Sequence, residues 1–136
     1  MRVAAGAVAK KYLESLGVKT TGYVSQIGSI KGSAINPSDA NTNKYFFADT
    51  SKLGDLDTMF TELIAEGNSV GAKLGVAIEN CPVGLGAPVF DKLDADLAKA
   101  MMSINAVKSV SIGNTDDILN LKGSEVRDEM RADGFT

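Results

Sequence analysis

The spacing of apolar residues predicts three helices, over Val3–Leu16, Leu53–Glu66 and about Asp91–Ser103. In the second and third helices these residues recur at positions that share one helix face, so each should bury one side. Glycines follow the first two segments, where a left-handed residue commonly ends a helix. Asp91 is expected to cap the start of the third helix. The face-forming residues are Leu56, Met59, Phe60, Leu63 and Ile64 in the second helix, and Phe90, Leu93, Leu97, Met101 and Ile104 along the third.

The first predicted helix differs because its opening half, VAAGAVA, is apolar on every face. A helix of this kind is normally buried all round, and its small side chains let neighbours approach closely. We therefore expect Val3–Leu16 to lie at the centre of a packed structure, one that can be larger than this chain.

Three further segments have the alternation or the β-branched and aromatic content of strands: Val18–Ile27, Val70–Ile78 and Val107–Ile112. Along Val70–Ile78 the larger apolar residues alternate with small or polar ones, which predicts one face on the core. The order of elements is α-β-α-β-α-β. It predicts an α+β fold with one domain over residues 1–136.

Two segments lack these patterns. Gly28–Ser51 is rich in polar residues and reads as a long loop, interrupted by Tyr45–Phe47, which is apolar enough to dock on the body. A structureless loop of that length is uncommon in a small domain, so it should be functional or an interaction element. Lys122–Thr136 is heavily charged and weakly patterned, and we expect it to be loop-like.

Composition narrows the function more than the fold. The 136 residues are 44% hydrophobic and 23% charged, as in ordinary globular proteins, with a net charge of −3. That charge argues against nucleic acid or an anionic membrane as the main partner, and no apolar run approaches the roughly 20 residues that span a bilayer. The single cysteine, Cys81, excludes an internal disulfide and favours a cytoplasmic setting.

The chain contains no histidine. No side chain here has an unperturbed pKa near neutrality, so imidazole acid–base catalysis, histidine–metal ligation and Ser–His–Asp triads are excluded within the chain. We predict no catalytic residue and no metal ligand in this segment. Cys81, beside a proline, is expected to be a small buried filler.

Two glycine-rich segments resemble nucleotide-binding loops only superficially. In Val83–Pro88 the glycines precede Val89, where a dinucleotide fingerprint needs a third glycine. Gly67–Lys73 lacks the Gly-Lys-Ser/Thr core of a P-loop. We interpret the first as a tight connection and the second as a helix end followed by a strand.

Two polar features allow more than one interpretation. Asp91, Asp94 and Asp96 could suggest a metal site, but acidic residues in a first helical turn usually interact with the positive end of the helix dipole, and we favour that explanation. Asn105 follows the third helix. It could be a C-cap, because asparagine tolerates left-handed geometry, or its amide could bind a ligand's polar edge.

Several segments, in order along the chain, resemble chorismate synthases. The start of the chain resembles the helix that follows that family's flavin-contacting Arg-Ser-Ser segment. Later stretches are similar to five of the family's motifs: Gly-Asp-Ser-Ile-Gly-Ala-Lys, Pro-Val-Gly-Leu-Gly-Glu-Pro-Val-Phe-Asp, Met-Ser-Ile-Asn-Ala-Val-Lys, Gly-Ser-x-x-Arg-Asp-Glu and Asp-Gly-Phe. The matching segments are Arg2–Leu13, Gly67–Lys73, Pro82–Ala98, Met102–Lys108, Gly123–Glu129 and Asp133–Phe135.

The resemblance implies a β-α-β sandwich with helices between antiparallel sheets, assembled as a homotetramer. It also implies conversion of 5-enolpyruvylshikimate 3-phosphate to chorismate and phosphate by 1,4-elimination, with reduced FMN. Asn105 and Ala106 occupy the positions at which the family contacts FMN. The central layer of such a sandwich would give the apolar first helix its place.

The chain also departs from the family pattern. Ala87, Lys99 and Ser109 replace the family's usual Glu, His and Gly. The chain also lacks the family's Gly-Glu-Ser-His motif, its second histidine, its Ser-Asn-His-Ala-Gly-Gly motif and several of its substrate-binding arginines. We therefore expect a central piece of a chorismate synthase that is inactive alone. The alternative is a non-catalytic binding or oligomerisation module of α+β fold.

Overall fold

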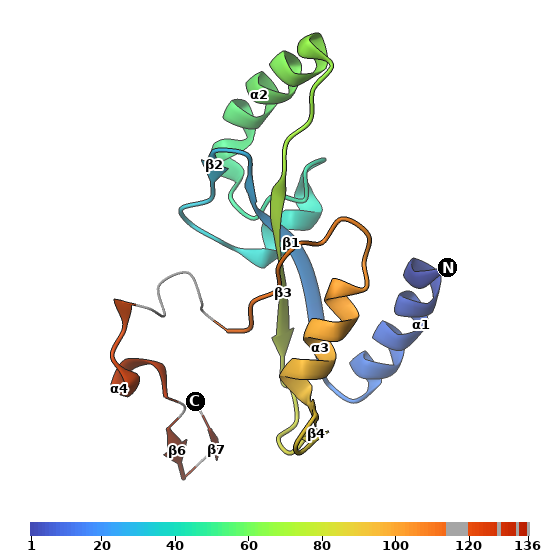
Figure 1. The fold of residues 1–136 in the computed structure, drawn as a ribbon, viewed down its shortest axis with the longest axis vertical. Helices are drawn as coiled ribbons and strands as arrows, with labels where there is room; N and C mark the ends of the chain where they lie inside the picture. Colours follow the sequence, from blue (N-terminus) through green and yellow to red (C-terminus); the bar gives the residue numbers. More distant parts are fainter. Residues whose placement is uncertain (114–119, 128, 133, 136) are drawn as a thin grey trace. The chain divides into compact units, whose positions relative to one another are not determined.

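The computed structural model describes residues 1–113, 120–127, 129–132, 134 and 135. The chain divides into two compact units, Met1–Pro82 and Val83–Thr136, each described here by itself. Both combine helices with antiparallel β-structure, which confirms the predicted α+β class (Figure 1). The prediction of one domain over 1–136 stays a prediction.

The first unit is built around an antiparallel sheet in the order β2-β1-β3. Its long strands are β1 (Lys19–Ile27) and β3 (Ala72–Glu79), which pair from Lys19↔Glu79 to Ile27↔Ala72 with a bulge between Val24 and Gln26. The short β2 (Ile30–Lys31) turns back on the end of β1. The strands predicted at Val18–Ile27 and Val70–Ile78 are thereby confirmed, the second shifted by one or two residues.

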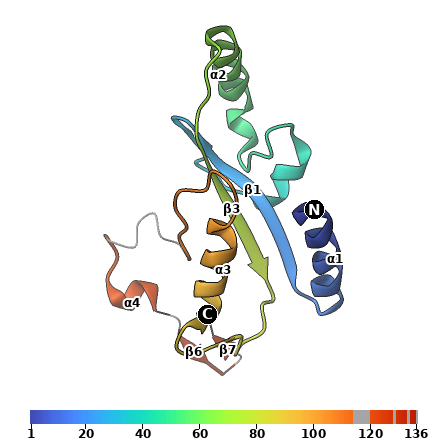
Figure 2. The same cartoon turned by 45° about the vertical axis from the view of Figure 1, so that its right-hand side comes forward.

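Two long helices belong to this unit, α1 (Arg2–Ser15) and α2 (Leu53–Glu66). Figures 1 and 2 show them toward opposite ends of the sheet. Both end as predicted at a glycine with positive φ, 84° at Gly17 and 64° at Gly67. In each case the next amide bonds back to a carbonyl in the last turn, Val18 to Leu13 and Asn68 to Leu63. The glycines thus satisfy carbonyls that a helix end would otherwise leave free.

The hydrophobic core of the first unit lies at the α2 end of the sheet. Phe47 and Leu56 are fully buried and Ile27 nearly so. Burying side chains of this size stabilises the fold by about 1.5–3 kcal/mol each. Half-buried neighbours from β1, the loop and α2 pack around them: Val24, Ile30, Tyr45, Leu53, Met59 and Phe60.

The segment Gly28–Ser51 is an ordered connection that supplies much of this core. It carries β2 and two 3₁₀ turns, Pro37–Thr42 and Thr50–Lys52, the second ending just after it. Tyr45–Phe47 docks as predicted, with Phe47 buried and bridged in parallel to Val24, but Phe46 points outward at 58% exposure. The Asn43 side chain holds this turn, because its oxygen accepts from the amides of Tyr45 and Phe47.

The carboxylate of Asp49 closes the same segment from inside. It is buried, and it accepts hydrogen bonds from the amide and hydroxyl of Ser33, the amide of Ala34, and the amide and hydroxyl of Ser51. The Ser51 hydroxyl, followed by the amides of Ser33 and Ala34, holds the pKa of Asp49 well below its usual range. One buried charge therefore joins the two ends of the loop.

A cluster of half-buried rings and exposed charges fastens the loop to α2. Tyr45 stacks on Phe60 with ring centroids 5.0 Å apart, and its hydroxyl donates to Asp57 at 2.5 Å. Lys44 lies 2.7 Å from the same carboxylate and 4.8 Å from the Tyr45 ring. The hydrogen bonds from Lys44 and Tyr45 lower the pKa of Asp57, and the Asp57 contact raises the pKa of Lys44.

Two segments of this unit are more exposed in this chain than their sequences predict. The first helix has no buried residue, although its apolar sequence predicts burial on all sides. On β3, Leu74, Val76 and Ile78 are 71%, 51% and 41% exposed. The reason is that α2 and the loop cover the sheet only at one end. On the opposite face of β3 the small Gly75 has a clear purpose, because the Tyr23 ring lies against the position that a Cβ would occupy.

The second unit begins with a tight hairpin of β4 (Gly86–Ala87) and β5 (Asp91–Lys92), followed by α3 (Leu93–Met102). The hairpin confirms a tight connection at this place. Gly84 and Gly86 both have φ 82°, and a Cβ on Gly86 would lie 2.5 Å from the backbone nitrogen of Leu93. Further along are α4 (Gly123–Val126) and a short ladder of β6 (Met130–Arg131) with β7 (Gly134–Phe135).

Several predictions for this unit need correction. Asp91 does not cap α3, because it pairs with Ala87 in the hairpin and Lys92 occupies the cap position. Phe90 is 87% exposed, because it lies in the turn between β4 and β5 and not on α3. Val107–Ile112 forms no strand, because its β-like composition finds no pairing partner among the described residues.

Two smaller expectations also change. Lys122–Thr136, expected to be loop-like, contains α4 and the β6–β7 ladder in its described part. Cys81 is exposed and is not a buried filler. Among the helices of the described residues, none is long and apolar enough to cross a membrane.

The core of the first unit can be tested at Leu56, which is fully buried. We expect Leu56→Ala to lower the free energy of unfolding by about 2–5 kcal/mol, because it leaves a cavity beside Phe47. Chemical denaturation followed by circular dichroism measures this. Ile64→Ala on the same helix, where the side chain is 77% exposed, should change stability by less than about 0.5 kcal/mol. Equal effects at the two positions would contradict the assigned core.

The Asp49 hydrogen bonds predict a pH dependence. Because folding lowers the pKa of this carboxyl, its contribution to stability is present above the unfolded value near 3.8 and is lost as the pH falls below it. Asp49→Asn should therefore lower the melting temperature at pH 6, and the difference from the unmodified chain should shrink between pH 4 and lower values. Asp55→Asn, on an exposed residue 4.0 Å from Lys52, is the control and should have little effect at either pH. A pH-independent effect of Asp49→Asn would contradict this role.

Candidate functional site

The residues singled out by sequence, Asn105 and Ala106, lie in an exposed turn directly after α3. The helix delivers them because its last turn is fixed: the amide of Ser103 bonds to Lys99 at 3.1 Å and that of Ile104 to Met101 at 3.0 Å. The Ser103 hydroxyl donates to the carbonyl of Ala100. The turn is therefore anchored to regular structure on its N-terminal side.

The turn itself spans Ile104–Val107. The amide of Val107 bonds to the carbonyl of Ile104 at 3.3 Å, and Ala106 has φ 69°, while Asn105 has no positive φ. This is the pattern of a type II turn, with Asn105 first and Ala106 second of the two central residues. Asn105 is thus not the C-cap, one of the two interpretations that the sequence left open, because Ser103 is the C-cap and Ala106 takes the left-handed conformation.

The chemistry of this turn suits a polar, planar ligand edge. The Asn105 side chain carries both donors and an acceptor and is exposed, and the methyl group of Ala106 leaves the neighbouring space open. Sequence reasoning named both residues but missed the backbone conformation of Ala106. No sequence signal could have revealed it, since alanine is not a residue that left-handed positions favour.

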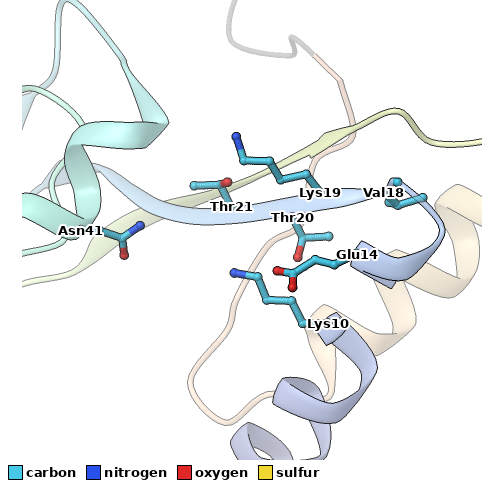
Figure 3. Close-up of a pocket in the computed structure, with 8 residues that line it drawn as sticks. Lys10, Glu14, Val18, Lys19, Thr20, Thr21 and Asn41 are labelled. Carbon is cyan, nitrogen blue, oxygen red and sulfur yellow. The ribbon is translucent and has the colours of Figure 1, made fainter. Parts of the chain in front are cut away.

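Two open hollows also occur, both in the first unit. The hollow in Figure 3 has a volume of about 310 Å³ between α1, β1 and the Pro37–Thr42 turn. Lys10 and Glu14 lie on the same side of β1 as Thr20, whereas Lys19 and Thr21 extend from the other side (Figure 3). Lys19 is paired with Glu79 at 3.4 Å, so the charges around this hollow nearly balance and select no ligand of one sign.

The second hollow, of about 370 Å³, involves a segment that resembles a family motif. It is lined by Gln26, Gly28, Gly71, Ala72 and Lys73. The side-chain amide of Gln26 donates to the carbonyl of Gly28 at 2.8 Å, and the backbone amide of Gly28 donates to the carbonyl of Gly71. The polar groups that line this hollow therefore hydrogen-bond to one another, where the end of β1 meets the start of β3.

The acidic residues of the third helix behave as helix-terminal charges. Asp94 and Asp96 lie in the first turn of α3, and Asp91 lies outside the helix in β5. Within the described residues, no group of three potential ligands is arranged to hold a metal ion. The acidic side chains therefore offer no reason to change the helix-dipole interpretation.

Comparison with known proteins identifies the family to which this chain belongs. The family model for chorismate synthase matches residues 1–135. A solved structure described as "Crystal Structure of Chorismate Synthase" is similar with a TM-score of 0.86 and 31% sequence identity, over 99% of this chain and 46% of that one. The chain thus spans about half the length of the structure it matches, and it shares that structure's α+β fold. Since the family model covers nearly every residue, the chain belongs to the chorismate synthase family.

Proposed function

We propose that this chain forms part of an enzyme that converts 5-enolpyruvylshikimate 3-phosphate to chorismate and phosphate in the shikimate pathway, the route to aromatic amino acids. The observation that supports this most directly is the family match over residues 1–135. The reaction removes a proton and the phosphate group from the substrate by 1,4-elimination. Reduced FMN, when bound, supplies electron density while the phosphate leaves.

The chain alone is proposed to be inactive. It has no histidine to accept or donate a proton near neutral pH. It covers 46% of the matched structure, so most of the acid–base and phosphate-binding groups are expected in the other part of such an enzyme.

The contribution we propose for this chain is one wall of the FMN site. Asn105 would bind a polar edge of the ring through its amide, and Ala106 would allow close approach because its side chain is a single methyl group. The exposed turn after α3 supports this assignment. A cytoplasmic location and assembly into a homotetramer belong to the same proposal.

One observation favours a second candidate, a non-catalytic binding or oligomerisation module. The apolar side chains of Leu74, Val76 and Ile78 on β3 are exposed, and α1 has no buried residue. Contiguous apolar surface of this kind commonly marks an interface. A cooperative melt together with no affinity for flavin would favour this candidate over the enzyme fragment.

The proposed inactivity is tested by an anaerobic assay of the purified 136-residue chain with 5-enolpyruvylshikimate 3-phosphate and chemically reduced FMN. We expect no release of phosphate above the rate without protein, because the chain lacks a neutral-pH acid–base residue. A complete chorismate synthase serves as the positive control. Turnover by the chain would contradict the proposal.

The proposed FMN contact is tested by titrating the chain with FMN and following the flavin fluorescence. We expect Asn105→Ala to weaken binding by about three- to tenfold, the usual effect of losing one hydrogen bond. Asn68→Ala, at an exposed asparagine whose side-chain oxygen accepts from the Ser69 amide, is the matched control and should leave affinity unchanged. Equal affinities for the unmodified chain and Asn105→Ala would remove Asn105 from the site.

A further inference from the structure

The two central residues of the Ile104–Val107 turn are not in the order that its backbone conformation favours. The second central position of a type II turn requires a positive φ, which glycine and asparagine tolerate best. Here asparagine occupies the first central position, and alanine takes the left-handed one at φ 69°. Exchanging the two would suit the turn better, so its stability alone does not explain this sequence.

The strained conformation has a close and unstrained alternative. Type I and type II turns keep the same four Cα positions and the same hydrogen bond across the turn, and they differ in the orientation of the central peptide unit. In a type I turn the second central residue has a φ near −90°, which suits alanine. Rotation of the Asn105–Ala106 peptide would therefore relieve Ala106 while the bond from Val107 to Ile104 remained in place.

The surroundings leave this peptide free to rotate. Both ends of the turn are held, by the α3 hydrogen bonds on one side and by half-buried Val107 on the other. Asn105 and Ala106 are exposed, and among the described residues neither the Ala106 amide nor the Asn105 carbonyl has a backbone partner. The left-handed cost for an L-residue corresponds to roughly a five- to thirtyfold difference in population, which ligand hydrogen bonds can offset.

We propose that the Asn105–Ala106 peptide is a two-position switch that turns either its N–H or its C=O toward a bound ligand. For the identity of that ligand the inference rests on the proposed function. A flavin ring gains an N–H donor on reduction, so its two oxidation states require opposite backbone groups at one place. The switch lets one turn bind both states, and the energy of Ala106 sets which state is bound more tightly.

The switch itself is tested without any ligand by NMR of the full chain. A type II turn brings the Asn105 Hα close to the Ala106 amide proton, whereas a type I turn brings the two amide protons together. We expect both sets of cross-peaks, or exchange broadening of the Ala106 amide. Ala106→Gly should raise the ratio of type II to type I turn about fivefold or more, because glycine removes the left-handed cost. Ala100→Gly inside α3 is the control and should leave the turn's pattern unchanged.

A second experiment compares the affinities of the chain for oxidised FMN and for reduced FMN, the latter measured anaerobically. Ala106→Gly should change the ratio of the two affinities by about fivefold, because it favours one peptide orientation. A single turn pattern that neither Ala106→Gly nor FMN alters would overturn the switch, and so would an equal change in both affinities. If the unmodified chain binds neither form, the proposed FMN site fails, and the NMR result alone decides whether the peptide has two positions.

Discussion

The first unit depends on one buried carboxylate. Asp49 accepts hydrogen bonds from residues at both ends of a long polar segment, and this lets the segment place Phe47 and Ala48 in the core. A loop of that composition would otherwise expose its backbone to water and leave α2 without a partner. The core therefore combines the hydrogen bonds of Asp49 with an apolar cluster, and each helps to position the other.

Outside this core the chain leaves apolar surface uncovered. The first helix and the far end of β3 have the sequences of buried elements, yet their side chains are exposed in this chain. Burial of such surface is the main favourable term in folding and association, at about 25 cal/mol per Å². Since the matched chorismate synthase structure is about twice as long, these surfaces suit contacts with protein beyond these 136 residues.

The second unit has a different character. None of its described residues is buried, and its main features are local: the glycine hairpin, α3 and the turn that follows. A site on such a turn is positioned by helix hydrogen bonds and by the bond across the turn. These bonds fix the ends of the turn but allow either orientation of the Asn105–Ala106 peptide, so the strain at Ala106 is more informative than its exposure.

The sequence by itself determined the main helices, both long strands, the glycine helix ends and the family, because these depend on local periodicity, backbone preference and motif order. Tertiary structure alone decided which apolar faces are covered, that Val107–Ile112 pairs with no other described segment, and that Asp91 enters a hairpin instead of capping α3. Burial and strand pairing require partners distant in sequence, and no local pattern reports whether those partners are present. For the same reason Asn105 and Ala106 could be named from the sequence, but the left-handed turn that presents them could not.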